Sequence, residues 1–507
     1  MSAVASSSAP RRHSSGASAT NLRRPNDKYE AVIGLEVHIQ LLTKSKAYSS
    51  DSTEYGAVPN TNVSVISLGH PGVLPKINTK MVEYGVRLGI ACNCVIREEN
   101  EYARKNYFYA DMPKGYQISQ HKTPICEGGY IEIKDKAGNS KNIELTRIHM
   151  EEDSGKSIHD QDPFNSLIDL NRAGVPLLEM VTEPIIETSE EAYQFLTEVR
   201  KLVRYLEICD GNMEEGSMRC DANISIREKG ASEMGEKVEV KNMNSIRNVQ
   251  RALEYEITRQ IKALDSNEKI DQETRTFDAA TGKTIVMRTK EMANDYRYFP
   301  EPDLPIVIVD EEYVKSIRES MPALPNELYK KYTSELGLSD YDATVITDSK
   351  AIALYFEELI GKTSKVKAAV NWIMGPVKSY LNENAKEISE FKVTTEVLAA
   401  LIELIENGTI SHSVATQKIF PLLIEGSDKS PMEIATENNW IKESDVGSIN
   451  EFVKQAIAKY PDKVAEYKGG KVGLIGLFMG EVMKLSKGKA DPKIASELVK
   501  KSLEESK

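Results

Sequence analysis

The chain's clearest hydrophobic pattern lies at positions 34–41, where apolar and polar residues alternate. Every second residue from Leu35 onward is apolar, and Glu36 and His38 fall between them. A period of two is typical of a strand with one buried face. Positions 218–227 alternate in the same way, with charged and amide side chains between the apolar ones. Both segments therefore predict strands whose polar faces are free for chemistry.

Three turns rich in glycine and polar residues predict antiparallel hairpins. They lie at 228–236, 138–139 and 281–282, each between two segments with strand-like patterns. Short turns of this kind join neighbouring antiparallel strands. Because an antiparallel sheet can keep one face in contact with water, we expect the polar groups of these strands to gather there.

Helical periodicity begins after residue 188 and dominates the chain beyond residue 305. The segment 188–191 (Thr-Ser-Glu-Glu) is a capping-box pattern that opens one helix, and a second helix begins near 244–245. The proline-rich segment 299–305 ends this mixed region. Beyond it the pattern predicts helices at 350–359, 366–382, 395–406 and 412–423.

These patterns predict an α+β fold followed by helical domains. A length of 507 residues is more than a single core usually spans. We predict a leader at 1–28, an α+β domain with an antiparallel sheet at 29–320, an all-α domain at 321–428 and a small basic helical tail at 429–507.

The net charge of the chain limits how it can bind nucleic acid. A formal net charge of −12 argues against general nucleic-acid affinity, which needs a basic surface, so any contact requires a local patch. The tail is locally basic, although a solvated helix face accounts for the same residues equally well. Its lysines are Lys468, Lys471, Lys484, Lys487, Lys489, Lys493, Lys500 and Lys501.

The remaining composition bears on the compartment. The sequence holds no apolar run long enough to cross a bilayer, and its five cysteines show no paired spacing, which suits a reducing compartment. Residues 1–26 are rich in Ser and Ala, contain four arginines and lack acidic residues. An organellar transit peptide and a disordered leader share this composition, so both interpretations stay open.

Two groups of side chains are candidate cation ligands. Glu36 and His38 are two positions apart on one predicted strand, so they point the same way and can share one cation. The segment 149–153 (His-Met-Glu-Glu-Asp) is acidic, and its mutual repulsion calls for a neutralising cation. Oxygen-rich ligands favour magnesium. Alternation places Glu151 and Glu152 on opposite faces, which leaves open which of them binds the metal.

Fixed cations accompany these carboxylates, and they can hold phosphate oxygens during phosphoryl transfer. The motif Gly-Lys-Ser at 155–157 is no phosphate-binding loop, because Met150 stands where that loop needs glycine. The sequence also lacks the nucleophile setting of an amidase or a glutaminase, so we do not expect the chain itself to liberate ammonia. The cations are Lys105, Lys114, Arg219, Lys241 and Arg297.

Six separated motifs carry a family resemblance. They are GLEVHIQL (34–41), RKNYFYADMPKGYQISQ (104–120), RIHMEEDSGKS (147–157), DLNRAGVPLLEMVTEP (169–184), MRCDANISIR (218–227) and DYRYFPEPDLP (295–305). From about residue 29 to its end, the chain resembles the B subunit of the aspartyl/glutamyl-tRNA amidotransferase family. The resemblance implies a cradle-shaped α+β domain distantly akin to glutamine synthetase, then a helical domain and a small tail that contacts tRNA.

The resemblance also implies a reaction. ATP phosphorylates the side-chain carboxylate of glutamate or aspartate mischarged on tRNA(Gln) or tRNA(Asn), and ammonia then displaces the phosphate to give the amide. The ammonia comes from a separate amidase, the A subunit, and a small third protein, the C subunit, holds the two together. A bacterial-type enzyme of this family is cytoplasmic, whereas a transit peptide at 1–28 would imply a mitochondrion or plastid.

Site residues follow from the matched motifs. ATP and Mg²⁺ are the implied cofactors. The resemblance implies that the cation is held by Glu36, His38, Glu151, Glu152 and Glu183, and that Asp221 joins the first four in catalysis. The resemblance further implies that six residues bind the nucleotide and the acyl-tRNA end. They are Lys105, Tyr107, Lys114, Arg219, Lys241 and Arg297.

Two departures from the family pattern stand out. Many members carry a zinc knuckle of two Cys pairs, whereas the aligned positions here are Ser49, Asp51, Ser64 and Ser67, so no zinc is expected. The tail has Asp491 where the family usually has Asn, which places a negative charge near the presumed tRNA surface.

Two other functions fit part of the sequence. A stand-alone ATP-dependent carboxylate–amine ligase would use the same cations on a small acid and would need no tRNA. A non-catalytic tRNA-binding scaffold would keep the basic tail and need none of the carboxylates.

Overall fold

The computed structural model describes residues 28–135, 137–159, 161–289, 295–442, 446–486 and 488–505. The predicted leader at 1–28 lies, except for Lys28, outside the described residues. The chain divides into two compact units, of which the first ends at Pro322 and the second begins at Ala323. No helix among the described residues has the length and apolar character needed to span a membrane.

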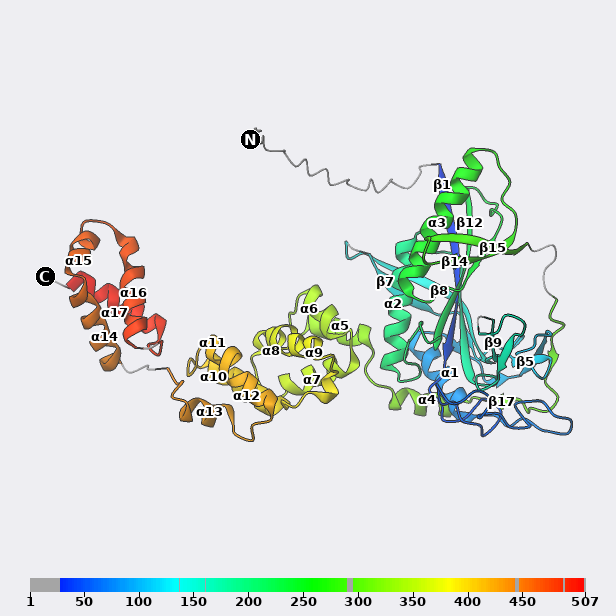
Figure 1. Ribbon diagram of the computed structural model, residues 1–507, viewed down its shortest axis with the longest axis horizontal. Helices are drawn as coiled ribbons and strands as arrows, with labels where there is room; N and C mark the ends of the chain where they lie inside the picture. The colour runs from blue at the N-terminus through cyan, green and yellow to red at the C-terminus, as the bar shows by residue number, and fades with distance from the viewer. Residues whose placement is uncertain are drawn as a thin grey trace, which may run out of the picture. The chain divides into compact units, whose positions relative to one another are not determined.

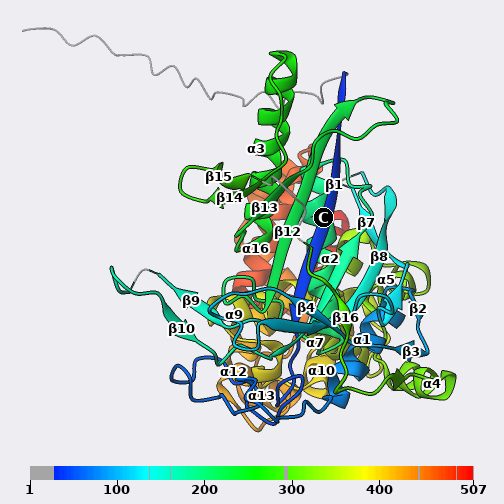
Figure 2. The same ribbon diagram turned by 90° about the vertical axis from the view of Figure 1, so that its right-hand side faces the viewer.

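A ten-stranded sheet forms the centre of the first unit (Figure 1). Its strands follow the order β15-β14-β13-β12-β1-β11-β8-β6-β2, and β7 pairs with β8. The two longest neighbours, β1 (Tyr29–Gln40) and β12 (Met218–Glu228), run side by side through the middle (Figure 2). The predicted strands at 34–41 and 218–227 are thus confirmed as neighbours in the centre of this sheet.

The three predicted hairpins are confirmed as antiparallel pairs. They join β7 to β8, β12 to β13 and β14 to β15. However, β13 (Val238–Lys241) and β14 (Glu273–Asp278) pair in parallel, which the expected antiparallel sheet did not include. Helix α3 (Ile246–Asp265) connects them, and a parallel pair needs such a crossover connection.

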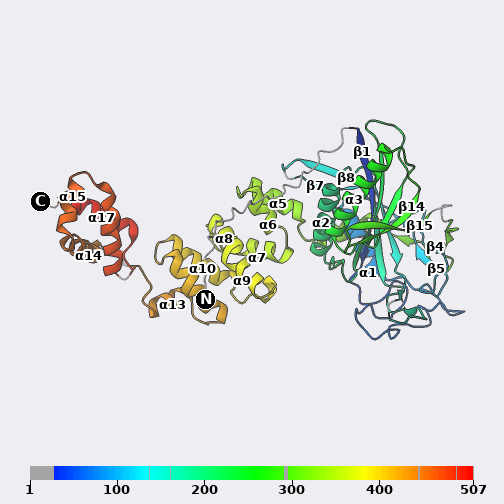
Figure 3. The ribbon, with the colours of Figure 1, turned by 45° about the horizontal axis from the view of Figure 1, so that its top comes forward.

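The sheet has one apolar and one polar face. Helix α1 (Thr79–Ala91) packs on the apolar face, where the backbone of Gly85 lies against Leu178 of β11 (Pro176–Thr182). Helix α2 (Ser189–Tyr205) packs against α3, and Figure 3 shows both on one side of the sheet with β4 and β5 on the other. The core therefore lies between the sheet and these helices, and the opposite face keeps its polar side chains.

Both predicted helix starts in this unit are confirmed. Ser245 accepts a hydrogen bond from the N–H of Asn248 and caps α3. Thr188 likewise accepts one from the N–H of Glu191 and caps α2. The reciprocal bond differs from a standard capping box, because the Glu191 carboxylate accepts from the N–H of Glu187 instead of Thr188.

The smaller strands of this unit form short sheets beside the main one. Three of them, β16-β4-β5, make a separate sheet, and the pairs β9-β10 and β3-β17 make two more. The bounds are β2 (Val95–Ile96), β3 (Glu99–Asn100), β4 (Ala103–Asn106), β5 (Tyr116–Ser119), β6 (Cys126–Glu127), β7 (Tyr130–Lys134), β8 (Ser140–Glu152), β9 (Lys156–Ile158), β10 (Leu167–Asp169), β15 (Lys283–Thr289), β16 (Phe299–Pro300) and β17 (Val307–Ile308), with helix α4 at Glu311–Ser320.

The described residues of the second unit form helices and their connections, as predicted. The segment predicted as one helix at 366–382 is interrupted by a π-helical turn at Ile373–Val377, which contains Pro376. Proline has no N–H to donate to the preceding turn, and a wider turn absorbs that loss. The segment predicted at 412–423 is likewise divided by a π-helical turn at Ala415–Ile419.

The last four helices share a hydrophobic core of their own. Ile449, Val453, Phe478, Val482 and Val499 are fully buried in it. The helices of this unit are α5 (Pro325–Ser334), α6 (Asp340–Ile346), α7 (Lys350–Ile360), α8 (Val366–Trp372), α9 (Lys378–Glu383), α10 (Thr395–Glu406), α11 (His412–Val414), α12 (Phe420–Glu425), α13 (Pro431–Glu437), α14 (Val446–Lys459), α15 (Pro461–Lys468), α16 (Ile475–Leu485) and α17 (Pro492–Glu505).

Candidate active site

Strand register assembles a row of ionisable side chains across the polar face of the sheet. His38 of β1 lies opposite Arg219 of β12 on one side and opposite Glu179 of β11 on the other. Glu179 in turn lies opposite His149 of β8. Residues that face each other on neighbouring strands point to the same side of a sheet. The row therefore runs from Arg219 through His38 and Glu179 to His149.

The His149 end of this row is part of a compact cluster of possible metal ligands. His149, Glu151 and Glu179 each offer one ligand atom, and these atoms lie within 4.8 Å of one another. His149 Nε2 is 3.1 Å from Glu151 Oε2 and 3.6 Å from Glu179 Oε2. His38 Nε2 approaches Glu179 Oε2 to 3.3 Å from the other side. We call His149, Glu151 and Glu179 the carboxylate–histidine cluster.

Burial and neighbouring charges together set the ionisation of this cluster. Burial raises the pKa of Glu179, but His149 and His38 outweigh it and hold that pKa well below its ordinary value. Burial lowers the pKa of His38, but the hydrogen bond and charge of Glu179 outweigh it and raise that pKa. Glu179 therefore carries its negative charge at neutral pH, as a cation ligand must.

Three of the predicted phosphate-binding cations lie on this face, each beside a carboxylate. Lys105 of β4 places its Nζ 3.2 Å from Glu151 Oε1. Arg219 donates to Asp153 Oδ2 at 2.8 Å. Lys241 forms ion pairs with Asp221 and, at 3.1 Å, with Glu239. The face therefore alternates positive and negative groups, as a site for an anionic substrate and a cation requires.

Glu36 shares this face, one step along β1 from His38. It lies opposite Asp221 on β12, and its Oε1 accepts a hydrogen bond of 2.8 Å from the amide of Asn223. Glu36 and Asn223 line a hollow of about 310 Å³. The structure thus brings Glu36 and Asp221 onto the predicted surface, beside the carboxylate–histidine cluster and outside its three members.

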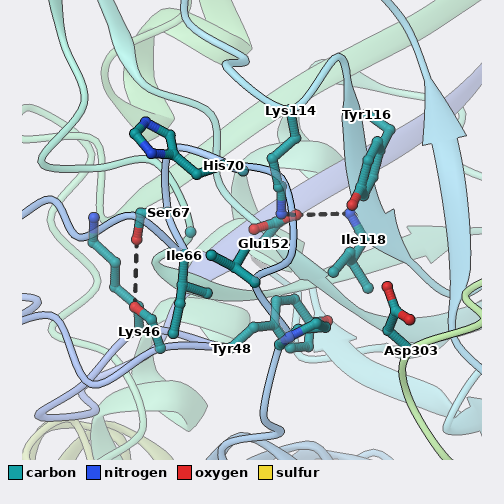
Figure 4. Close-up of a pocket in the computed structure, with 15 residues that line it drawn as sticks. Lys46, Tyr48, Ile66, Ser67, His70, Lys114, Tyr116, Ile118, Glu152 and Asp303 are labelled. Carbon is teal, nitrogen blue, oxygen red and sulfur yellow. Dashed lines mark hydrogen bonds and ion pairs between the residues drawn. The ribbon is translucent and has the colours of Figure 1, made fainter.

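Glu152 lies beside Lys114 and Ile118 (Figure 4). Its Oε1 accepts a hydrogen bond of 2.8 Å from the N–H of Ile118 and pairs with Lys114. Together with Lys46 and Tyr48, these residues line a separate small cavity. Successive residues of a strand point to opposite faces, so the two neighbouring glutamates serve different sites.

Glu183 also lies outside the cluster. It follows the end of β11, beyond a register shift at Val181 and Thr182, and its Oε1 accepts a hydrogen bond of 2.8 Å from the Thr146 hydroxyl. The structure therefore does not bring Glu183 or Glu152 together with the three clustered residues.

Glu179 belongs to the carboxylate–histidine cluster but was not among the candidates predicted from the sequence. It stands in the segment Leu-Leu-Glu-Met-Val at 177–181, whose apolar flanks predict a buried strand. An isolated carboxylate in such a segment is costly to bury unless it has a partner. This cost of burying Glu179 was the one sign in the sequence that the residue has a special role. Which side chains pair with it depends on strand register, which the sequence does not show.

Arg297 and Tyr107 line another hollow beside the cluster. Its volume is about 940 Å³, and it also includes Lys105. The N–H of Arg297 donates to Asp295 Oδ1 at 3.0 Å, and Tyr107 donates to the side-chain oxygen of Gln117 at 3.2 Å. Lys105 thus lines this hollow and also contacts the carboxylate–histidine cluster.

The four positions aligned with a zinc knuckle do come together. Asp51 accepts hydrogen bonds from the Ser64 N–H at 2.8 Å and from the Ser67 hydroxyl, and the Ser49 hydroxyl lies 3.3 Å from that of Ser67. Structural zinc is bound by thiolates and imidazoles. Three neutral hydroxyls and one carboxylate already engaged in hydrogen bonds do not fit that metal.

Asp491 has a local role in the tail. Its carboxylate accepts hydrogen bonds from the N–H groups of Lys493 and Ile494, at 2.9 and 3.2 Å, at the start of α17. Asp and Asn are equally good N-caps, so this helix start tolerates either residue.

Comparisons with known proteins show which family the chain resembles. The GatB/GatE catalytic domain matches residues 31–315, and a second domain described as the GatB domain matches residues 354–503. A protein of Thermodesulfovibrio yellowstonii is 48% identical over 478 residues, which cover 94% of this chain and 100% of that protein. A protein of Geobacter sulfurreducens is 48% identical over 94% of this chain and 99% of its own length. A protein of Trichodesmium erythraeum is 46% identical over 94% of this chain and 98% of its own length.

All three relatives are named as the B subunit of an aspartyl/glutamyl-tRNA(Asn/Gln) amidotransferase. Both the domain match and the full-length similarity cover most of the sequence. On these grounds the chain belongs to the GatB/GatE family.

Proposed function

We infer that this chain is the B subunit of a tRNA-dependent amidotransferase, an ATP-dependent ligase. It would convert Glu-tRNA(Gln) to Gln-tRNA(Gln), Asp-tRNA(Asn) to Asn-tRNA(Asn), or both. The similarity over nearly the full length supports the assignment. The observation that carries it is the convergence of His38, His149, Glu151 and Glu179 with Lys105 on one face of the sheet.

The chemistry requires two anions to meet. Transfer of the γ-phosphoryl group of ATP to a carboxylate brings a phosphate and a carboxylate together, and their repulsion must be offset. The clustered carboxylates Glu151 and Glu179, with His149 beside them, fit a divalent cation. Mg²⁺ needs only one or two protein carboxylates, because waters and phosphates supply its other ligands. When bound there, it would neutralise charge on the ATP phosphates.

Residues of the chain supply the remaining positive charge. Lys105, Arg219 and Lys241 stand on the same face within hydrogen-bonding distance of acidic neighbours. We propose that they shift toward phosphate oxygens when the substrates enter, since they are already held at the edge of the site. Burial lowers the pKa of Lys105, but Glu151 and Glu179 outweigh it and raise that pKa, so Lys105 stays charged at neutral pH.

Partners follow from what the reaction needs. The sequence lacks the nucleophile setting of an amidase, so ammonia must come from another protein. We propose that its source is an amidase, the A subunit of the enzyme, and that a small C subunit joins the two, with mischarged tRNA as the second substrate. The named relatives are subunits too, which supports a multi-subunit enzyme.

The test replaces one member of the cluster. Glu179→Gln keeps the side-chain size and removes the charge that His38 and His149 contact. In the complex assembled with the amidase and the small third protein, we expect ATP-dependent amidation of Glu-tRNA(Gln) or Asp-tRNA(Asn) to fall by about a hundred-fold or more. The fall should be equal with glutamine or ammonium as the nitrogen donor, while tRNA binding stays unchanged.

Glu183→Gln is the matched control. Glu183 lies close by in sequence, but it contacts Thr146 instead of the cluster. We expect this variant to retain most amidation. Full activity of Glu179→Gln would overturn the assignment. A wild-type protein that amidates a small acid with ammonium and without tRNA would instead indicate the stand-alone ligase.

A further inference from the structure

Arg147, on the polar face of the sheet, is a cation without a partner among the residues that the structure describes. Within that part of the chain its guanidinium donates no hydrogen bond and forms no ion pair, and its Nε is buried without an acceptor. Lys105, Arg219 and Lys241 on the same face each pair with a carboxylate. A buried donor left unpaired is costly, so Arg147 needs a partner from outside the chain. For a guanidinium, the best partner is an anion with two acceptor oxygens.

Strand register gives Arg147 neighbours that do not neutralise it. Arg147 of β8 lies opposite Val181 of β11 on one side and opposite Glu127 of β6 on the other. Val181 is apolar, and the Glu127 carboxylate accepts a hydrogen bond of 2.7 Å from Arg97. The neighbouring strands therefore leave the guanidinium of Arg147 available to a ligand.

Arg147 lies beside the carboxylate–histidine cluster. Alternation along β8 puts Arg147, His149 and Glu151 on one face of the sheet. The Nδ1 atom of His149 is also buried, and no residue that the structure describes bonds to it. Two side chains next to each other on this face thus carry a buried nitrogen without a partner. Unsatisfied buried groups of this kind indicate that a ligand completes the site.

Tyr298 shows that Arg147 and the cluster face the same space. The pKa of the Tyr298 hydroxyl is raised to about 12, chiefly by burial, with Glu151 and Glu179 adding to the rise and the charge of Arg147 opposing it. A hydroxyl that responds to all three charges lies within electrostatic reach of each of them. The Tyr298 ring is itself supported by His121, which stacks on it with 4.2 Å between the ring centroids.

The two anions of the proposed reaction need separate cations. Arg219 and Lys241 stand on β12 and β13, on one side of β1, whereas Arg147 stands on β8, beyond β11 on the other side. In phosphoryl transfer the attacking and leaving oxygens lie roughly in line, on opposite sides of the transferred group. Cations on both sides of the cluster meet this need, because one set can hold phosphate oxygens and the other the attacking carboxylate.

Resting on the proposed function, we propose that Arg147 binds the side-chain carboxylate of the aminoacyl group and thereby distinguishes the acid substrate from the amide product. The guanidinium donates two parallel hydrogen bonds to the two carboxylate oxygens. An amide cannot accept both bonds, because its nitrogen is a donor and it carries no charge. The product therefore binds Arg147 more weakly than the substrate, which favours its release.

The experiment measures how tightly the complex with its partner subunits binds the acid and the amide forms of one tRNA, in the absence of ATP. The wild type should bind Glu-tRNA(Gln) about ten-fold or more tightly than Gln-tRNA(Gln), or Asp-tRNA(Asn) more tightly than Asn-tRNA(Asn), because the amide loses a charged hydrogen-bonded pair. Arg147→Gln should bind the two forms equally. Arg147→Lys keeps the charge but loses the planar fork, so a smaller preference should remain.

Arg227→Gln serves as the control. Arg227 lies on the same face of β12, but it pairs with Glu30 at 2.6 Å, at the opposite end of β1 from His38. We expect this variant to keep the wild-type preference for the acid. The affinity for uncharged tRNA and the KM for ATP should stay unchanged in the Arg147 and Arg227 variants, which would show that their folds are intact.

A kinetic measurement separates this inference from the proposed function. In ATP-dependent amidation, kcat/KM for the aminoacyl-tRNA should fall about ten-fold or more in Arg147→Gln. If the wild type prefers the acid and Arg147→Gln does not, but no amidation occurs, the carboxylate site stands and the proposed reaction fails. If the wild type amidates and Arg147→Gln keeps the preference, the reaction stands and the carboxylate site fails.

Three other results would overturn the carboxylate site. The first is equal affinity of the wild-type complex for acid and amide in both tRNA pairs. The second is a raised KM for ATP alone in Arg147→Gln, which would place a phosphate of ATP on Arg147. The third is an equal loss of affinity for acid, amide and uncharged tRNA in that variant, which would make Arg147 a structural residue.

Discussion

Replacing Asp51 with alanine removes the acceptor that closes the segment 49–67. Residues 53–78 form turns and no helix or strand, and most of their backbone hydrogen bonds, such as that from Leu68 to Ser64, span only a few residues. The Asp51 carboxylate bridges this segment by accepting from the Ser64 N–H and the Ser67 hydroxyl, and the Asp51 N–H donates to the Ser49 hydroxyl at 3.3 Å. We expect Asp51→Ala to open this segment locally and to leave the sheet folded.

The size of the effect follows from the two bonds to the carboxylate. A hydrogen bond to a charged group contributes about 1.5–3 kcal/mol net, but Asp51 is half-buried and water replaces part of each bond. We therefore expect Asp51→Ala to lower the free energy of opening this segment by about 2 kcal/mol. This corresponds to a roughly thirty-fold larger open population of the segment at equilibrium. Asp51→Asn keeps one oxygen acceptor, so its open population should lie between those of Asp51→Ala and the wild type.

Hydrogen exchange measured by mass spectrometry checks this prediction peptide by peptide. Amides of 49–67 should exchange faster in Asp51→Ala, whereas those of β1 and β12 should not change. Asp278→Ala is the matched control, because Asp278 caps the β14–β15 turn through the Ala280 N–H and the Thr281 hydroxyl. If Asp51→Ala and Asp278→Ala leave 49–67 equally protected, the carboxylate is not what closes this segment.

Two further predictions concern the small cavity around Lys46. Burial lowers the pKa of Lys46 to about 8, so the unfolded chain binds more protons than the folded one between pH 8 and 10.5. The free energy of unfolding should rise with pH across that window, and Lys46→Met should lose this part of the pH dependence in thermal melts. Glu152→Gln removes the charge that holds Lys114. Because the family resemblance places Lys114 at the nucleotide, we expect this variant to lose ATP-dependent amidation and to keep tRNA binding in filter assays. Normal amidation would show that the reaction does not need the Glu152–Lys114 pair.

The elements that the sequence predicted well are those defined by short-range patterns. The alternation in 34–41 and 218–227 identified β1 and β12, because one buried face leaves a period of two in the residues themselves. Ser245 and Thr188 marked helix starts, because N-caps are chosen by local hydrogen bonds. Hairpin turns were predictable for the same reason.

The features that sequence patterns missed depend on contacts between distant residues. Glu179 joins the cluster only because β11 pairs with both β1 and β8 in one register. A shift of one residue would turn its carboxylate into the apolar core, and local sequence carries no sign of that choice. The parallel pairing of β13 with β14 is likewise set by how α3 packs, which a pattern of strand and helix does not determine.

The hollow lined by Tyr107 and Arg297 illustrates a third kind of limit. Phe108 and Phe299 lie in the same matched motifs as Tyr107 and Arg297, but the sequence does not show that they are exposed, because aromatic residues usually signal a core. Only the structure shows that they are exposed, and that a hydrogen bond from Asn106 to the Arg297 carbonyl joins two segments almost two hundred residues apart along the chain.

At the end of β8, two adjacent glutamates take part in different sites and are held by the same neighbouring strand. Glu151 faces the carboxylate–histidine cluster, and Glu152 faces the cavity of Lys114. Strand β5 contacts both, because the Ser119 hydroxyl bonds to Glu151 at 3.4 Å and the Ile118 N–H bonds to Glu152 at 2.8 Å. These two donors are neighbours on one short strand, so a shift of β5 toward either glutamate also moves the donor of the other. The two sites therefore share β5 as a common support, although none of the three cluster residues lines the cavity.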